Sequence, residues 1–368
     1  MIITLFSNTS WSLYNFRKDF ILKLLRENHK VKIISNTDET TKHLMKMGCK
    51  FIPIKFDHVS KNPIKEFLFL TKLFFLILKT SSDIYVNFTI KPCIYFGLVN
   101  FFFKKKSISL FDGLGRSLIK ESYLSKLIIL LLKFSQKNTN RIILVNKDDI
   151  NFFFQKQIVK NKKKIFYLKA PGLNVDNFKF KKRLIGKKKI LTFSFISRVM
   201  KEKGIIIFLR AAEKIKSKFK SNFVVVGKIE SNEINKILKV YERKKVIKYY
   251  KNQKKVKPKI LQSDCIVLPS YYREGLPRIL QESNYYGRIC ITTNNVGCKD
   301  VIINDFNGFL CKKNSTLDLT KKIEKVILMD RKKISKMESK GHYFIKKNFD
   351  KRVINKKFVK LINEINRV

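Results

Sequence analysis

The feature that most constrains the fold of this chain is an alternation of short apolar runs with longer runs of helical periodicity. In the first half, strand-like runs occupy residues 2–7, 29–35, 49–56, 83–88, 106–111 and 141–146. Helix-like runs at 14–28 and 38–48 separate the first three, and Gly48 is expected to be the C′ residue of the second helix. This β-α-β-α order predicts an α/β fold with a parallel sheet covered on both faces.

The alternation pauses in a polar, basic stretch at residues 178–189 and then begins again. A helix-like run covers 204–219, and the strand-like runs lie at 189–197, 222–227, 244–250, 265–270 and 289–294. A chain of 368 residues exceeds one ordinary core. We therefore predict two similar domains, 1–180 and 181–368, with the last helix packing back on the N-terminal domain.

The charge is strongly unbalanced: 80 Lys and Arg face 28 Asp and Glu, a formal net charge of +52. One interpretation is attraction to an anionic partner, such as nucleic acid, an acidic membrane leaflet or a phosphorylated substrate. The other is compositional, because AT-rich codons encode the abundant Lys, Asn, Ile and Phe. Both interpretations remain open. With 45% hydrophobic residues and 32 Phe, two packed cores are expected and global disorder is not.

The six cysteines form no C-x-x-C pair, and no His stands at ligand spacing from them. Neither a zinc site nor a disulfide framework is indicated, which suits a reducing compartment. The first residues lack the charged leader and long apolar stretch of a signal peptide and are expected to form a strand.

Two apolar segments approach membrane character, and a third is of a different kind. The runs at 67–79 and 127–134 fall short of the ~20 apolar residues that a membrane span needs, so we expect buried or amphipathic helices. The segment "FFFKKK" at 101–106 places aromatics directly before lysines. It fits a lipid interface and equally fits a helix end that turns into solvent.

Two acids eight residues apart, Glu274 and Glu282, flank a Gly-Leu-Pro just after the strand at 265–270. Ligands of parallel sheets bind at the carboxyl ends of strands, and a helix start attracts anions. Pro277 suits the first helical position, and Gly275 permits a tight turn. Carboxylates accept hydrogen bonds from paired sugar hydroxyls, so the stretch predicts a nucleotide-sugar site. Two surface glutamates that neutralise nearby arginines remain the alternative.

A second basic segment follows the strand at 189–197. Arg198 and Lys203 flank a turn that leads into the next helix. Arg suits bidentate phosphate contact and Lys acts as a point charge, so the pair is suited to neutralise a diphosphate. Ordinary helix-capping charges are the alternative explanation for either residue alone.

These motifs resemble those of glycosyltransferase family 4, retaining enzymes with the two-domain GT-B fold. "EGLPRILQE" (274–282) is similar to the family's E-x7-E motif, "SRVMKEKG" (197–204) to its R-x4-K segment, and "VGCKDVIINDFNGFL" (296–310) to the family's loop and strand after the second glutamate. Near the N-terminus, "SNTSWSLYNFR", "NFTIKPCIYFG", "DGLGRSL" and "VNKDDINFF" resemble a narrower bacterial subset. Those members add N-acetylgalactosamine or a related sugar to polyprenyl-diphosphate-linked saccharides during surface glycan or glycoprotein assembly.

The resemblance implies two Rossmann-like domains whose parallel sheets face a central cleft, the first for the acceptor and the second for the nucleotide sugar. Arg198 and Lys203 would bind the donor diphosphate, Glu282 the ribose, and Glu274 the hydroxyls of the donor sugar. Gly275, Leu276 and Pro277 would bring backbone N–H groups to the sugar and phosphate. Asp112 would face the reacting centre and position the acceptor or assist as a base.

The resemblance also implies partners and a place in the cell. The donor would be a UDP-sugar, the acceptor a polyprenyl-diphosphate-saccharide of lipopolysaccharide, capsule or related polysaccharide biosynthesis. The enzyme would be cytoplasmic and peripheral on the inner face of the cytoplasmic membrane, in contact with its anionic surface. No metal or other cofactor is expected, because Arg198, Lys203 and a helix terminus would stabilise the leaving diphosphate.

One departure concerns packing: Asn284, Tyr285 and Tyr286 stand where the family has small residues after the second glutamate, and we expect them to crowd that helix. Two other function classes stay open. A basic nucleic-acid-binding protein fits the charge, although no helix-turn-helix, zinc finger or RNA-binding motif is present. A sugar-nucleotide epimerase of the same fold would need no acceptor.

Overall fold

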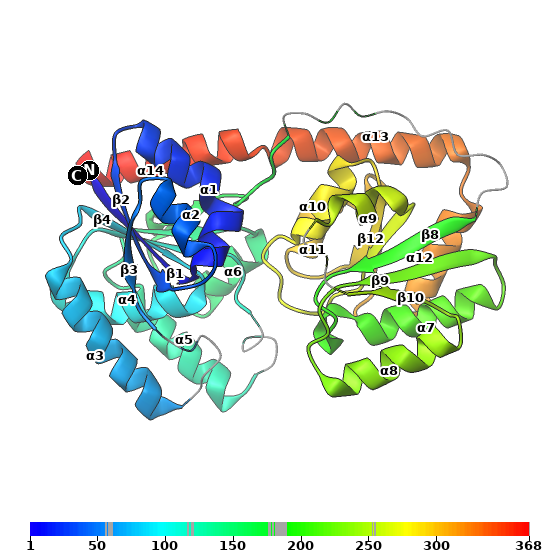
Figure 1. Cartoon of the computed structure of the whole chain (residues 1–368), viewed down its shortest axis with the longest axis horizontal. Coiled ribbons are helices and arrows are strands. Elements are labelled where there is room, and N and C mark those ends of the chain that lie inside the picture. The colour runs from blue at the N-terminus through cyan, green and yellow to red at the C-terminus, as the bar shows by residue number, and fades with distance from the viewer. Residues whose placement is uncertain are drawn as a thin grey trace. The chain divides into compact units, whose positions relative to one another are not determined.

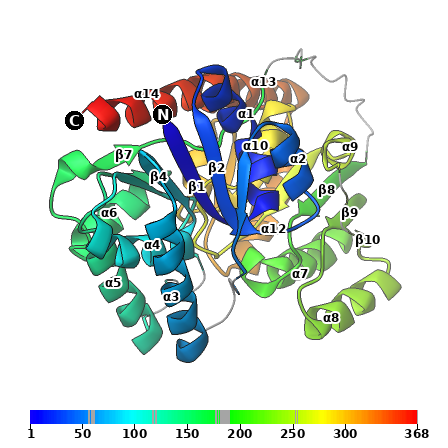
Figure 2. The same cartoon turned by 60° about the vertical axis from the view of Figure 1, so that its left-hand side comes forward.

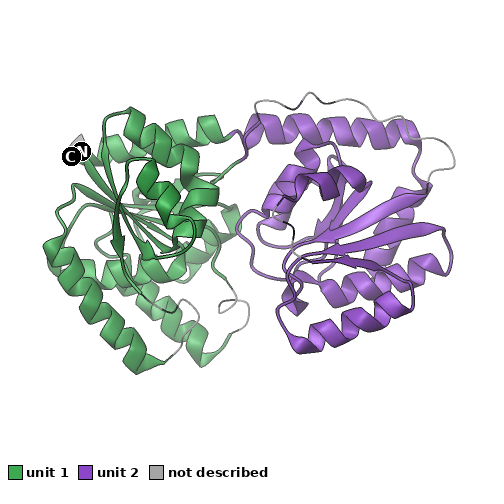
Figure 3. Ribbon diagram, in the orientation of Figure 1, with its two compact units in different colours: residues 1–172, 351–368 green, residues 173–350 purple. Residues whose placement is uncertain are grey.

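The computed structural model describes residues 1–55, 57, 62–115, 118, 121–175, 178, 180, 190–251, 253 and 255–367. The chain divides into two compact units (Figure 3). Unit 1 consists of residues 1–172 and 351–368, and unit 2 of residues 173–350. The sequence-based boundary lies between residues 180 and 181, and 181–189 are outside the described residues.

Unit 1 is built on a seven-stranded sheet in the order β3-β2-β1-β4-β5-β6-β7. All of its pairings are parallel. The strands are β1 (Ile2–Thr9), β2 (Lys30–Asn36), β3 (Lys50–Pro53), β4 (Ile84–Phe88), β5 (Ser107–Phe111), β6 (Arg141–Leu144) and β7 (Ile165–Tyr167). Strands β4 and β5 are buried along their whole length, as expected of the centre of a sheet with two covered faces.

The helices of unit 1 cover both faces of this sheet. They are α1 (Ser10–Arg26), α2 (Thr41–Lys46), α3 (Pro63–Lys79), α4 (Ile90–Phe103), α5 (Tyr123–Ser135), α6 (Lys147–Gln155) and α14 (Lys351–Arg367). Helices α1 and α2 lie on one side of the sheet, and α3, α4 and α5 lie on the other (Figures 1 and 2). No helix among the described residues is long and apolar enough to cross a membrane.

Unit 2 repeats the plan with a six-stranded parallel sheet in the order β10-β9-β8-β11-β12-β13. Its strands are β8 (Leu191–Ile196), β9 (Ser221–Val226), β10 (Lys248–Tyr250), β11 (Cys265–Leu268), β12 (Ile289–Thr293) and β13 (Gly308–Cys311). Its helices are η3 (Lys201–Lys203), α7 (Ile205–Lys216), α8 (Asn232–Arg243), α9 (Lys257–Gln262), α10 (Arg278–Tyr285), α11 (Cys298–Val301), α12 (Thr316–Leu328) and α13 (Arg331–Asn348).

The two parallel-sheet α/β domains predicted from the alternation are therefore confirmed. Gly48 lies directly after the C-cap Met47 with φ +98°, as predicted for a C′ glycine. The strand predicted at 244–250 is shorter, because only Lys248–Tyr250 pair with β9. The apolar runs at 67–79 and 127–134 belong to α3 and α5, each of which buries one side.

The last helix, α14, is part of unit 1 although it follows the whole of unit 2 in sequence. Phe358 of α14 stacks on Phe20 of α1 with ring centroids 4.4 Å apart. Lys351 Nζ, at the start of α14, lies 2.5 Å from Oδ2 of Asp19 in the middle of α1. Buried aromatic stacking and this ion pair hold the C-terminal segment on α1.

Candidate active site

The stretch that carries the two glutamates follows β11, a fully buried strand in the middle of the unit 2 sheet. After this strand the chain turns through residues 269–277 and enters α10. Pro277 was predicted at the first helical position but is the N-cap of α10, because its backbone is still extended at ψ 113° and the helix begins at Arg278. The N-cap residue makes no side-chain capping bond, and the positive end of a helix dipole attracts an anion.

Glu274 is the centre of a buried polar cluster at this strand end. Its side chain is 9% exposed, and Oε1 lies 2.5 Å from Lys203 Nζ, whose side chain is 12% exposed. Ser270 donates to the same oxygen at 2.7 Å. The predicted residues Lys203 and Glu274, distant in sequence, are thus in direct contact. A buried charge pair of this kind needs the additional hydrogen bond to offset its desolvation.

A close backbone approach brings Lys203 to this position. Gly204 has φ +83°, and a Cβ placed there would lie 2.1 Å from the carbonyl oxygen of Pro269. Only glycine allows η3 and α7 to contact the end of β11 so closely. The carbonyl of Glu202 then accepts from the backbone N–H groups of Tyr271 and Tyr272 at 2.9 and 3.0 Å.

The segment after β12 supports the same loop from its other side. Asn295 donates to the carbonyl oxygens of Ser270 and Tyr272 at 3.2 and 2.7 Å, and Thr293 also donates to Ser270. Gly297 has φ +74°, and a Cβ there would lie 2.1 Å from the carbonyl oxygen of Gly275. The Glu274–Pro277 segment is therefore held in place before any ligand binds.

The two other predicted charged residues of unit 2 have different surroundings. Arg198 follows β8; its side chain is 54% exposed, and its Nη1 is 3.8 Å from Glu230 Oε1. Glu282 lies in the second turn of α10 and accepts from Arg278 Nε at 2.7 Å. Neither contact is buried, so both side chains can exchange their present partner for a ligand at little cost.

Gly275, Leu276 and Pro277 form the buried turn between Glu274 and α10. Leu276 is 9% exposed, and its carbonyl accepts from Gln281 Nε2 at 3.1 Å. This bond ties the turn to the helix that follows, so the backbone of the turn keeps one orientation relative to α10.

Asp112 lies in unit 1, directly after β5 and at the carboxyl edge of its sheet. Arg17 of α1 lies beside it, with Nη2 2.5 Å from Asp112 Oδ1. Arg17 is 5% exposed and its guanidinium also lies over the ring of Phe88 at 5.0 Å, whereas Asp112 is 35% exposed. A buried cation therefore orients a carboxylate that reaches solvent.

Sequence reasoning missed Arg17, Ser270 and Asn295 as site residues. The signal for Arg17 was present: it shares the buried side of α1 with Leu13, Phe20 and Leu24. An arginine in an apolar helical stripe requires an acidic partner nearby. Ser270 and Asn295 gave no comparable signal, because their roles depend on which loops meet.

The predicted crowding after Glu282 is relieved by the helix that packs on α10. Asn284 donates to the carbonyl oxygens of Arg288 and Asn307 at 3.0 and 3.1 Å. Gly341 of α13 faces it, where a Cβ would lie only 3.0 Å from the Asn284 side chain. Tyr285 stacks on His342 of α13 at 5.1 Å. The large residues after the second glutamate thus fill a matching surface.

All six cysteines are buried and unpaired by disulfides. Burial, with a smaller contribution from the Glu274 carboxylate, raises the pKa of the Cys298 thiol to about 12. Cys298 is therefore a neutral packing residue next to the cluster. Among the described residues, no group of three or more His, Cys, Asp or Glu side chains is arranged to hold a metal ion.

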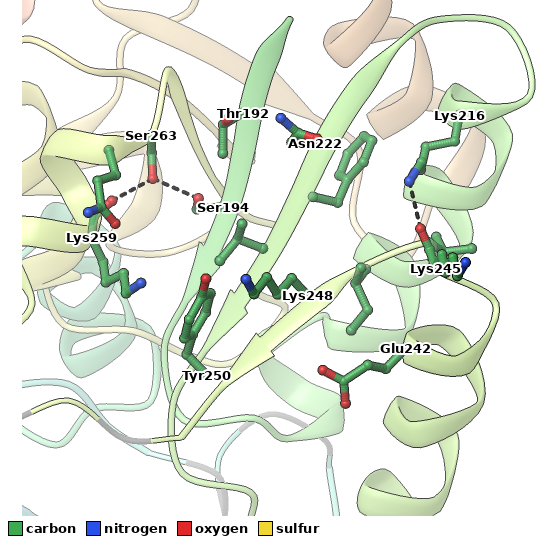
Figure 4. A pocket seen from close by; sticks show the side chains of 15 residues that line it. Thr192, Ser194, Lys216, Asn222, Glu242, Lys245, Lys248, Tyr250, Lys259 and Ser263 are labelled. Atoms are coloured by element: carbon green, nitrogen blue, oxygen red, sulfur yellow. Dashed lines mark hydrogen bonds between the residues drawn. The ribbon is translucent and has the colours of Figure 1, made fainter.

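A separate cavity of about 550 Å³ lies over strands β8, β9 and β10 (Figure 4). Polar and basic side chains line it, among them Ser194, Lys248, Tyr250 and Lys259. None of the predicted site residues lines this cavity. The candidate active site is therefore defined by the strand-end cluster and not by this hollow.

Comparison with known proteins assigns both halves of the chain. Residues 3–146 match the family described as glycosyl transferase 4-like, and residues 174–342 match the glycosyl transferases group 1. The chain is similar to N,N'-diacetylbacillosaminyl-diphospho-undecaprenol alpha-1,3-N-acetylgalactosaminyltransferase of Campylobacter jejuni. The two are 26% identical, and the alignment covers 99% of each sequence.

Solved structures share the whole architecture. A glycosyltransferase from Rickettsia africae is 19% identical with a TM-score of 0.76, covering 99% of this chain and 98% of its own. Anabaena HepE in complex with UDP is 13% identical with a TM-score of 0.78, covering 99% of each chain. These likenesses identify the fold of the chain as GT-B.

Proposed function

Since this chain is a glycosyltransferase, with a glycosyl transferase 4-like domain followed by a group 1 domain, we propose that it uses a UDP-sugar as donor. The transferred sugar is an N-acetylhexosamine and the acceptor a polyprenyl-diphosphate-linked saccharide of surface glycan or glycoprotein assembly. The activity of the Campylobacter relative, which adds N-acetylgalactosamine to an undecaprenol-diphosphate-linked sugar, supports both choices.

The observation that carries the proposal is the Lys203–Glu274–Ser270 cluster at the uncapped start of α10. A UDP-sugar presents a diphosphate beside a ring of hydroxyls. Lys203, Arg198 and the backbone N–H groups at α10 supply positive charge for the diphosphate, while Glu274 accepts hydrogen bonds from sugar hydroxyls. Glu282 takes the ribose hydroxyls in exchange for Arg278.

The chemistry follows from where charge develops. The bond between the anomeric carbon and the diphosphate oxygen breaks, and its electron pair leaves with UDP. The acceptor hydroxyl oxygen forms the new bond on the same face of the sugar, so the configuration is retained. Its proton passes to the departing diphosphate. Arg198, Lys203 and the α10 terminus stabilise that leaving group, and the proposed reaction is independent of a metal ion.

On the acceptor side we assign Asp112 to orient the attacking hydroxyl. Its carboxylate is about one-third exposed and is fixed by the buried guanidinium of Arg17. A carboxylate oriented in this way can accept a hydrogen bond from an acceptor hydroxyl. The lipid-linked acceptor places the enzyme on the cytoplasmic face of the membrane as a peripheral protein.

The test is UDP release from a panel of UDP-sugars, with and without a polyprenyl-diphosphate-linked sugar. Release from one donor that increases with the acceptor, and that persists in EDTA, is the expected result. Conversion of a donor to its epimer without acceptor would replace the proposal with an epimerase. Absence of UDP release from every donor would contradict the assigned donor class.

A further inference from the structure

Helix α3 is apolar on the side that faces solvent. Phe69, Leu73 and Ile77 form its buried stripe. The residues on the opposite side are each more than half exposed: Ile64, Phe67, Leu68, Phe75 and Leu78. Successive helical residues are about 100° apart, so these positions fall in one band opposite the core. A helix of a globular domain normally presents charged or polar residues there.

Helix α5 repeats the pattern. Leu132 is buried against the domain, whereas Tyr123, Leu127, Leu130 and Phe134 recur at helical spacing on the outer side. Tyr123, at the first turn of the helix, is 92% exposed, and the other three are about half exposed. Helices α3 and α5 lie on the same side of the sheet (Figures 1 and 2), and each packs against α4.

The end of α4 joins the same surface. Phe101 and Phe102 are 51% and 71% exposed in its last turn. The ring of Phe74 on α3 contacts Phe102 at 5.8 Å and Phe75 at 5.7 Å, forming a connected row of aromatic rings. The predicted segment "FFFKKK" is thus a helix end whose phenylalanines continue the α3 surface, and Lys104 turns the chain in the left-handed conformation at φ +51°.

The charge on these helices is mostly positive. Lys65, Lys72 and Lys79 recur every seven residues along one flank of the α3 stripe, and Lys126 and Lys133 do so on α5. Within their bounds, α3, α4 and α5 contain a single acidic residue, Glu66, which pairs with Lys91 at 2.8 Å and accepts from Tyr95. The surface is therefore apolar with a basic border.

We propose that the outer surface of α3, α5 and the end of α4, here called the α3–α5 face, docks on an anionic lipid bilayer. Phe, Leu and Tyr side chains enter the boundary between headgroups and acyl chains, and the flanking lysines contact lipid phosphates. The helices lie in the plane of the interface and do not span it. Helix α3, with 17 residues, provides about 25 Å of contact length.

The position of this face suits the proposed function, on which this part of the inference rests. Helix α3 runs into β4 and therefore begins at the carboxyl edge of the parallel sheet, the edge at which Asp112 follows β5. Helix α5 also begins at that edge. The diphosphate of a lipid-linked acceptor would then lie near the end of unit 1 that carries Asp112, while its lipid chain stays in the bilayer.

A second copy of the chain is the other candidate occupant. In a two-fold interface the face would meet itself, and Lys65, Lys72 and Lys79 would approach other lysines. The one acid within these helices, Glu66, is already paired with Lys91. Glu121, the exposed acid just before α5, lies 3.5 Å from Lys156. Charge complementarity therefore favours an anionic surface.

The test is co-flotation of the full chain with vesicles of phosphatidylglycerol and phosphatidylcholine, without any substrate. Phe75→Asp and Phe134→Asp are expected to lower the partition coefficient at least tenfold. A triple variant is expected to lower the partition coefficient on the order of 5-fold per lysine. It combines Lys65→Gln, Lys72→Gln and Lys79→Gln. Leu328→Asp, at a 72% exposed residue of unit 2, is the matched apolar control.

Lys236→Gln, Lys239→Gln and Lys321→Gln, at exposed lysines of unit 2, are the matched charge controls and should leave binding unchanged. An equal loss in this triple variant would mean that net charge alone drives binding and would overturn the proposal. Concentration-dependent dimerisation abolished by Phe75→Asp, with no vesicle binding, would replace the bilayer with a second copy.

The docking result is independent of catalysis. Suppose that the chain has no transferase activity on any acceptor, and that it binds vesicles but loses this binding in Phe75→Asp. This outcome would support the docking face and contradict the proposed function. With an active chain, Phe75→Asp should retain turnover of a water-soluble short-chain acceptor and lose turnover of the vesicle-embedded one. Equal turnover of both acceptors would refute the role of the face in acceptor delivery.

Discussion

Replacing Glu274 tests both the buried cluster and its proposed role. Glu274→Gln keeps the size of the side chain and removes its charge. The carboxylate accepts from Lys203 at 2.5 Å and from Ser270 at 2.7 Å, and both charged side chains are about nine-tenths buried. Losing a charge-assisted hydrogen bond and leaving an ammonium without its counter-ion should lower the free energy of unfolding by about 2–4 kcal/mol.

The same variant should lose transfer while it remains folded, because a chain of this kind has roughly 5–15 kcal/mol of stability. Removing a charged contact to the reacting sugar should reduce the rate of UDP release by about 100-fold or more. Glu274→Ala should behave in the same way with a larger loss of stability. Urea unfolding and UDP release on the same preparations measure the two effects separately.

A double-mutant cycle with Lys203→Met separates the pair from its surroundings. Residues in direct contact should show a coupling free energy of about 1–3 kcal/mol. The double variant should therefore lose less stability than the two single variants lose together. Additive losses within ~0.5 kcal/mol would refute the buried ion pair. Full transfer by a folded Glu274→Ala variant would refute the assignment of Glu274 to the donor sugar.

Three further expectations rest on the described contacts. Asp112→Asn should destabilise unit 1 by roughly 2 kcal/mol more than Arg17→Met in urea unfolding. Asp112→Asn leaves the buried guanidinium of Arg17 without its counter-ion, whereas in Arg17→Met water can hydrate the exposed Asp112 carboxylate. Equal losses in the two variants would contradict this difference in burial. Gly204→Ala should cost about 3 kcal/mol or more and also abolish transfer, whereas Gly48→Ala, with φ +98° but nothing within 4 Å of a Cβ, should cost only about 1 kcal/mol. The pKa of the Cys298 thiol is about 12 in the folded chain and 9.0, its ordinary value, in the unfolded chain, so between these pH values the folded state binds more protons. The free energy of unfolding should therefore fall as the pH rises through this range. The fall should be less steep in Cys298→Ser.

The elements around the candidate active site were predictable because their patterns are local. The strand at 265–270, the turn at Gly275–Pro277 and the helix behind it were expected from an apolar run followed by Gly-Leu-Pro, and β11 and α10 occupy these positions. The family resemblance implied that Lys203 and Glu274 serve one donor site, but their direct contact was not predicted. It depends on Gly204 reaching the carbonyl of Pro269, a backbone approach that no spacing within either segment encodes.

The sequence by itself determined the α/β class, the two-domain plan and the resemblance to glycosyltransferases, because hydrophobic period and short motifs act over a few residues. Only the tertiary structure decided that Arg17 fixes Asp112, that Ser270 and Asn295 hold the loop between β11 and α10, and that α3 and α5 turn apolar bands outward. A helical pattern with two apolar sides does not predict which of the two sides is buried. That choice is made by long-range packing against the sheet, where burying one stripe necessarily leaves the other to solvent or to a partner.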